Sequence, residues 1–114
     1  MPTTEMALPA VLESTYIVVW EYQVKAECEA EFVAAYGPDG EWARFFRRSR
    51  EFICVELLGS VGNAARFFTL DHWCSATAMD EFLAANATAY DVMDRRFSGL
   101  TVWERRIGGF PTDA

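Results

Sequence analysis

The amino-acid sequence predicts a single α+β domain with the element order β-α-β-β-α-β and one four-stranded antiparallel sheet. Its length of 114 residues suits one domain. Segments with the two-residue alternation of strands are interleaved with segments whose apolar residues recur every three or four positions, as in helices. Hydrophobic residues make up 52% and aromatic residues 15% of the chain, which is more than one small core needs. The surplus predicts a lined pocket, a subunit interface or both.

The first half of the chain contains one predicted strand and one interrupted helix. Residues 1–14 hold two prolines and are predicted to form a loose arm with a short turn at 10–13. Residues 15–24 are rich in β-branched and aromatic side chains and are predicted to form the first strand. Helical spacing over 26–36 is broken by Gly-Pro-Asp-Gly and resumes over 41–48, so two helical segments with a turn between them are expected.

The second half supplies three more strands and one helix. Strands are predicted over 52–60 and 66–74, joined by a hairpin loop, and over 100–107. Ser75 is a suitable N-cap for one continuous helix that ends at Ser98-Gly99. Residues after 107 are predicted to leave the sheet, with the domain spanning 15–110 and a tail at 111–114.

This element order is the ferredoxin-like arrangement, in which both helices cover one face of the sheet. The other face would carry about half of the strand side chains, many of them apolar, and therefore needs a cover. A second copy of the same sheet is the simplest cover. The sequence therefore predicts a homodimer whose two sheets close into a barrel.

Charge and cysteine content restrict the classes of partner. The net charge of −7 makes nucleic acid and anionic membrane surfaces poor partners, and no apolar run is long enough to cross a bilayer. The arginines near residues 44–50 and 95–96 are expected to neutralise helix C-termini, with an anion site as the alternative. Three cysteines without metal-ligand spacing predict free buried thiols in a reducing compartment, and with no secretory leader apparent a cytoplasmic location is expected.

Three stretches of the chain resemble the antibiotic-biosynthesis-monooxygenase-like group of the dimeric α+β barrel proteins. They are Val-Val-Trp-Glu-Tyr-Gln-Val-Lys at 18–25 followed by Glu-Ala-Glu-Phe at 29–32, Val-Glu-Leu-Leu at 55–58, and Leu-Asp-His-Trp-Cys-Ser at 70–75 followed by Phe-Leu at 82–83. The likeness spans about 16–107. It implies a homodimer with a pocket between the sheet and the helices of each subunit.

The resemblance implies two functional hypotheses and leaves a third disfavoured. Some members of the group oxidise quinols or polyketide-derived aromatics without metal or flavin, so an oxygenase for a small aromatic compound, needing no cofactor, is the first hypothesis. Many members have no assigned activity, so a non-catalytic ligand-binding or interaction domain with a self-filled pocket is the second. Haem-degrading members keep a tryptophan where Trp73 stands, but also an asparagine on the first strand and a haem-ligating histidine on the second helix. Trp20 stands near the first of these places, and Leu83 and Asn86 near the second, so haem degradation is disfavoured.

Three titratable residues are candidate bases. His72 is the only histidine, and strand alternation places it on the face opposite to Trp73, where a hydrogen-bonded structural histidine is the alternative to a catalytic one. Glu56 and Asp71 lie inside apolar strands that could bring them onto one face. A desolvated carboxylate has a raised pKa and can take a proton from a phenol or quinol. The alternative is that each pairs with an arginine such as Arg66 or Arg105.

Four further residues are candidate ligand contacts. Trp20, Phe67 and Trp73 are predicted to shape the pocket, and each could equally be a core residue. Asn86 could hydrogen-bond a ligand or satisfy a backbone group. No metal-binding residues, phosphate-binding glycine loop or nucleophile elbow are recognised.

Overall fold

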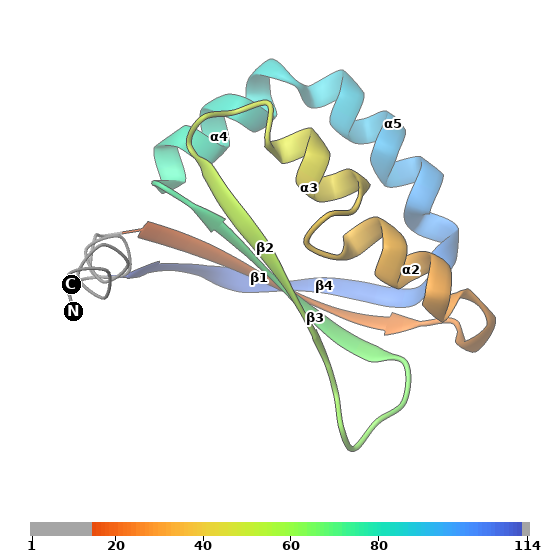
Figure 1. The fold of residues 1–114 in the computed structure, drawn as a ribbon. Coiled ribbons are helices and arrows are strands. Elements are labelled where there is room, and N and C mark those ends of the chain that lie inside the picture. Colours follow the sequence, from red (N-terminus) through yellow and green to blue (C-terminus); the bar gives the residue numbers. More distant parts are fainter. Residues whose placement is uncertain (1–14, 113–114) are drawn as a thin grey trace.

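The computed structural model describes residues 15–112, and within them one sheet carries helices on one side only (Figure 1). The predicted N-terminal arm and its turn, and the last two residues of the predicted tail, lie outside the described residues. The elements in chain order are β1 (Thr15–Val24), η1 (Ala26–Cys28), α2 (Glu29–Tyr36), α3 (Glu41–Phe46), β2 (Phe52–Gly59), β3 (Arg66–Trp73), α4 (Ala76–Ala85), α5 (Ala87–Phe97), η2 (Ser98–Leu100) and β4 (Thr101–Thr112). The predicted α+β element order is confirmed.

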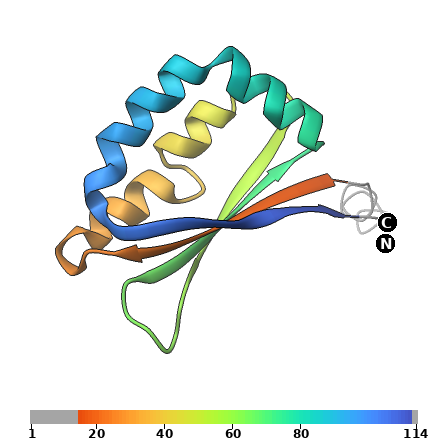
Figure 2. The ribbon, with the colours of Figure 1, turned by 180° about the vertical axis from the view of Figure 1, so that it is seen from behind.

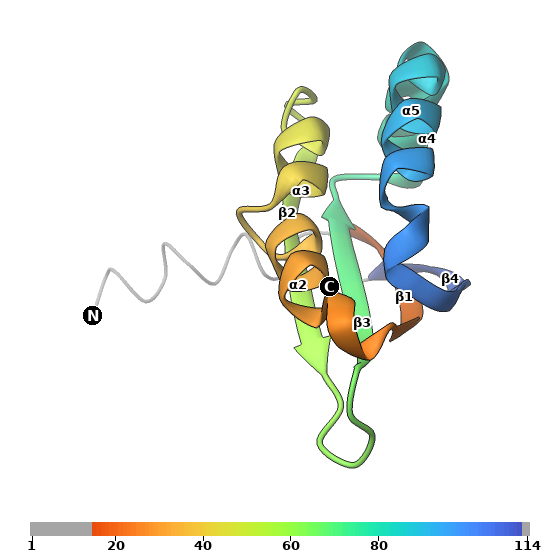
Figure 3. The same cartoon turned by 90° about the vertical axis from the view of Figure 1, so that its right-hand side faces the viewer.

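The sheet has the strand order β2-β3-β1-β4, and every neighbouring pair is antiparallel. The central pair is β1 with β3, in which Val18 lies opposite Asp71 and Tyr22 opposite Phe67. The edges of the sheet are β2 and β4. In side view, α2 and α3 form one column and α4 and α5 another on the same side of the sheet (Figure 3). The reverse view shows no helix on the other face (Figure 2).

Each helical region is interrupted once, between α2 and α3 and between α4 and α5. Residues 37–40 separate α2 from α3, as predicted. The prediction of one continuous helix after Ser75 is wrong, because Asn86 has φ −121° and ψ 26° and ends α4. Its side-chain Nδ2 donates to the Phe82 carbonyl oxygen at 2.8 Å, a local bond of the kind that competes with regular helix. The predicted N-cap is confirmed, since Ser75 Oγ accepts from Ala78 N at 3.0 Å.

Strand β4 is longer than predicted, and the prediction that the chain leaves the sheet after residue 107 is wrong. Residues 108–112 continue to pair with β1, with Gly108 opposite Val19 and Pro111 opposite Tyr16. Proline is tolerated because β4 is an edge strand with one side free of ladder hydrogen bonds. A Cβ at Gly109 would lie 1.8 Å from the Tyr16 hydroxyl oxygen, so this glycine permits the close approach of the Tyr16 ring.

The core is mainly aromatic and lies between the sheet and the two helix columns. Phe32 has no exposed surface and stacks on Tyr36 with ring centroids 4.2 Å apart. Trp73 is 1% exposed and packs against Phe46 and Phe82. The expectation of buried thiols is wrong for Cys74, which follows β3 and is exposed. None of the helices within 15–112 combines the length and the apolar character needed to span a membrane.

Candidate functional site

Alternation along the strands separates the titratable residues onto two faces of the sheet. On β3, Asp71 and Trp73 point toward the helices, whereas Arg66 and His72 point to the uncovered side, called here the open face. On β1, Trp20 and Tyr22 point toward the helices and Glu21 belongs to the open face. The strand register therefore shows which residues of β1 face the helices.

A hollow lies between the sheet and the helices, and we call it the acidic hollow because three carboxyl groups line it. Its lining residues come from both helix columns and all four strands: Trp20, Tyr22, Tyr36, Trp42, Phe46, Val55, Thr69, Asp71, Tyr90, Asp94 and Glu104. It is narrow, with a cavity volume of about 30 Å³. A second hollow of about 60 Å³ shares Trp20, Phe46, Asp71 and Tyr90 with it and extends to Trp73 and Arg106. Asp71 and Trp20 therefore border both spaces.

Asp71 is the most strongly perturbed carboxyl group of this site. Burial raises its pKa from 3.8 to about 7, and no charged group contributes to the shift. The Asp71 residue is partly exposed by surface area, although protein atoms surround its carboxyl group almost completely. Asp71 lines both hollows. Asp71 therefore combines a raised pKa with access to the hollow.

The rest of the lining contains acceptors and aromatic rings but no cation. The pKa of Glu104 is raised by burial and by the nearby charge of Asp94. Tyr22 Oη and Thr69 Oγ1 are hydrogen-bonded to each other at 2.9 Å. Burial raises the pKa of Tyr90 to about 12, so this phenol stays protonated at neutral pH. Uncharged aromatic compounds suit such walls better than anions.

The three predicted bases are not brought together. The possibility that Glu56 and Asp71 share a face is excluded by the register, in which Glu56 lies opposite Leu70 while Asp71 lies opposite Val55. Glu56 Oε1 lies 2.6 Å from His72 Nε2 on the open face. The alternative prediction, that Glu56 pairs with an arginine, is wrong, because its ion-pair partner among the described residues is His72. The geometry leaves Asp71 as the predicted base that reaches the helix-side hollow.

The four predicted ligand contacts occupy different surroundings. Trp20 lines both hollows. Trp73 borders the second hollow but is almost fully buried in the core. Phe67 faces the helices and packs against Phe32 with ring centroids 5.2 Å apart. The Asn86 side chain satisfies a backbone carbonyl, which is the alternative that the sequence left open.

Several lining residues were not among the predicted contacts. Tyr36, Trp42 and Tyr90 belong to helical stripes that are interpreted from sequence as core packing. Glu104 lies on β4 directly opposite Tyr22, and only this pairing places it on the helix side. An acidic residue within the last predicted strand, next to Trp103, was the one available signal. Among the described residues, the buried indole Nε1 of Trp42 has no hydrogen-bond partner of normal geometry. The indole does lie near the Tyr36 hydroxyl, and this proximity offsets part of the rise that burial causes in the pKa of Tyr36.

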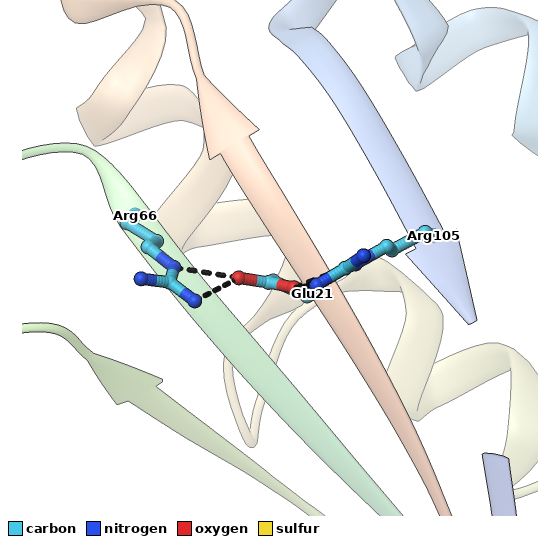
Figure 4. Close-up of polar contacts among 3 residues, drawn as sticks. All are labelled: Glu21, Arg66 and Arg105. Atoms are coloured by element: carbon cyan, nitrogen blue, oxygen red, sulfur yellow. Dashed lines mark hydrogen bonds and ion pairs between the residues drawn. The ribbon is translucent and has the colours of Figure 1, made fainter. Parts of the chain in front are cut away.

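The open face contains a separate ionic group, called here the Glu21 cluster: Glu21, Arg66 and Arg105. The Glu21 carboxylate lies between an arginine from β3 and an arginine from β4 (Figure 4). Arg66 Nε donates to Oε2 at 2.6 Å and Arg105 Nε donates to Oε1 at 2.8 Å. Burial alone would raise the pKa of Glu21, but hydrogen bonds and charges from Arg105 and Arg66 outweigh it and lower the pKa. The 1% exposure of Glu21 reflects cover by these two side chains, which themselves reach solvent.

Two of the arginines near residues 44–50 bind the turn that connects α2 and α3. Arg44 donates to the Asp39 carbonyl oxygen at 2.7 Å and Arg47 to the Pro38 carbonyl oxygen at 2.8 Å. Both bonds close the turn between α2 and α3. These contacts are structural, but they are made with a turn and not with the last carbonyl groups of a helix.

Comparison with known proteins identifies relatives of the fold. No family model matches the sequence, and no curated protein does. Solved structures do match. A point mutant of SnoaB, "a cofactor-independent oxygenase from Streptomyces nogalater", is 20% identical, with a TM-score of 0.68 over 88% of this chain and 94% of SnoaB. A "putative antibiotic biosynthesis monooxygenase" from Bordetella bronchiseptica is 15% identical, with a TM-score of 0.67 over 90% of this chain and all of that one. The chain therefore has the fold of the antibiotic-biosynthesis-monooxygenase-like structures that its sequence resembles.

Proposed function

We propose that this protein is an oxygenase that uses no bound cofactor, acts on a small uncharged aromatic phenol or quinol, and takes the substrate proton with Asp71. The observation that carries the proposal is a carboxyl group on the wall of an aromatic hollow, whose pKa burial raises to about 7 and which forms no ion pair within residues 15–112. Structures of the same fold include a protein described as a cofactor-independent oxygenase.

The chemistry needs a base that is stronger than an ordinary carboxylate. A phenol has a pKa near 10, so transfer of its proton to a group with a pKa of about 7 is uphill by roughly 3 units, against roughly 6 for an unperturbed aspartate. The resulting electron-rich anion can donate electrons directly to dioxygen. Some such substrates have a keto form with a CH₂ group in the ring. In that case one oxygen atom of dioxygen converts the CH₂ group into C=O, and the other leaves as water with the two hydrogens of the CH₂ group.

Trp20, Tyr36 and Trp42 would hold the ring of the substrate by stacking and edge contacts. Because the hollow is narrow, a ring must displace side chains from their present positions. The partly exposed Trp20, which borders both spaces, is the residue best placed to move. Its movement would join the two hollows over Asp71.

The same narrowness favours one alternative, a non-catalytic domain whose own aromatic side chains fill the pocket. The two functions differ in one measurable property. The oxygenase consumes dioxygen with a phenol or quinol, whereas the self-filled domain does not.

Oxygen consumption across a panel of hydroquinones, naphthols and anthrone-type phenols tests the proposal. We expect the rate with an accepted substrate to rise with pH and to level off above an apparent pKa of about 7, because Asp71 acts only when ionised. His72→Gln is the control for the other candidate base, since glutamine keeps an N–H donor for Glu56. If the dependence of the rate on pH disappears in His72→Gln, the base is His72 and not Asp71. If no compound of the panel causes oxygen uptake, the self-filled domain is favoured.

We also propose that the protein is a homodimer joined through the open face. Three large apolar side chains of that face are more than 40% exposed in the single chain: Leu58, Trp103 and Phe110. Their burial against a second copy is favourable at roughly 25 cal/mol per Å².

Leu58→Glu should weaken association at least tenfold, because it places an unpaired charge in the contact. Sedimentation velocity measures this, with Val92→Glu on the helix side as the matched control. Equal masses for wild type and Leu58→Glu would place the interface elsewhere.

A further inference from the structure

The Glu21 cluster carries more positive than negative charge. Two guanidinium groups share one carboxylate, so the net charge of the cluster is +1. Each arginine directs its Nε and one Nη toward Glu21, which leaves further N–H donors unused on both sides. The guanidinium carbons lie over aromatic neighbours, that of Arg66 at 5.3 Å from the Phe68 centroid and that of Arg105 at 5.8 Å from the Trp103 centroid. The cluster is therefore held in place and still able to bind another acceptor.

A hollow lies directly beside this cluster on the open face. It has a volume of about 320 Å³ and is lined by Glu21, Asn63, Arg66, Trp103 and Arg105. In the homodimer proposed above, a second sheet would cover it. Covering a net positive charge without a counter-ion is costly, because desolvation is then not offset by a new ion pair. The covering surface is therefore expected to supply a carboxylate.

The open face itself contains one carboxylate that fits this role. Among strand residues of the described chain, Glu21 and Glu56 are the acidic side chains on that face, and Glu21 is already held by both arginines. Glu56 is 53% exposed and contacts His72 at 2.6 Å. The carboxylate of Glu56 is opposite in sign to the net charge of the Glu21 cluster.

The positions of the two groups suit a two-fold axis. Glu56 is on edge strand β2 and Arg105 is on the opposite edge strand β4. A two-fold that places β2 of one copy over β4 of the other brings the opposite charges together at two equivalent places, because a residue contact in such an interface occurs twice. The reverse arrangement, β4 over β4, would bring two positive clusters together.

We propose that Glu56 of the partner subunit completes the Glu21 cluster by binding the free donors of Arg66 and Arg105. This inference rests on the homodimer proposed above and adds which residues pair across it. The contact sets the alignment of the two sheets and selects a second copy of this chain over other apolar partners.

Charge exchange tests the pairing. Glu56→Arg and Arg105→Glu should each weaken dimerisation at least tenfold in sedimentation equilibrium, because each places like charges together. An equimolar mixture of the two variants should recover association to within about threefold of wild type, since both contacts of the mixed dimer then join opposite charges. Glu31→Arg, an equal charge change on exposed α2, should dimerise as wild type does.

A second measurement does not depend on the Arg105 variant, which loses one partner of Glu21. Glu56→Gln should associate more weakly than wild type at 50 mM salt, and this difference should shrink at 500 mM salt as the ion pair is screened. A dimer unaffected by Glu56→Arg and Glu56→Gln, or a mixture that stays as weak as its components, would overturn the pairing and leave the dimer intact. A wild-type chain that stays monomeric would overturn the dimer itself.

Discussion

Replacing Asp71 with asparagine is expected to lower oxygen consumption at least 100-fold and, at the same time, to make the protein more stable at pH 8. Loss of a general base removes a factor of about 10² to 10⁴ in rate. The gain in stability has a different origin. In wild type above pH 7, folding must hold a carboxylate in a desolvated place without a cation, and the neutral amide of asparagine removes that cost.

The pH dependence of this gain follows from the direction of the shift. The pKa of Asp71 is raised from 3.8 in its unperturbed form to about 7 in the fold. Below pH 3.8 the carboxyl is protonated in both states and costs nothing. The cost grows as pH rises from 3.8 to 7 and is constant above that value. At about 1.4 kcal/mol per pKa unit, the full shift corresponds to about 4 kcal/mol, and we expect about 2–4 kcal/mol because the hollow admits some water.

Urea unfolding of wild type and Asp71→Asn at pH 4 and pH 8 measures this difference. The matched control is Asp91→Asn, the same substitution at an exposed position of α5, which should change neither activity nor the pH dependence of stability. An Asp71→Asn variant that keeps wild-type activity would remove Asp71 from the mechanism. An equal change in stability at both pH values would show that the carboxyl is not desolvated.

Replacing Trp73 with alanine is expected to cost about 3–5 kcal/mol of unfolding free energy, the range for a large buried aromatic side chain. Trp73 is 1% exposed, and its ring lies 5.2–5.6 Å from the rings of Phe46, Phe52 and Phe82. Small domains have total stabilities of about 5–15 kcal/mol, so the variant should lose a large share of its stability. Its melting temperature should fall by roughly 15 °C or more.

Thermal and urea unfolding at one fixed protein concentration test the role of Trp73, because association also contributes to apparent stability. Trp73→Phe should lose much less than Trp73→Ala, since it keeps a ring in the cluster. Val92→Ala, at an exposed position of α5, should stay within about 0.5 kcal/mol of wild type. A loss below about 1 kcal/mol in Trp73→Ala would mean that this side chain forms a pocket wall that can be removed without disturbing the core.

Local patterns predicted the fold well where neighbouring residues determine the conformation. The β-branched run at 15–24, the Gly-Pro-Asp-Gly interruption and the Ser75 cap each act within a few residues, and each prediction was confirmed. The errors lie where a distant part of the chain changes the outcome. Residues 108–112 resemble a tail until β1 is beside them, and Asn86 breaks a helix whose apolar stripe continues across it.

The sequence by itself determined the element order, the fold class and the fact that Asp71 and Trp73 face opposite to His72, because strand alternation is a local rule. Tertiary structure alone decided which of these faces the helices cover, and hence that Asp71 is desolvated while His72 is not in the same hollow. It also brought Glu104 beside Asp94, and placed Glu21 between Arg66 and Arg105. Those groups are far apart in the chain, and their distances depend on strand register and helix packing, which are set by the burial of the whole core and not by any short segment.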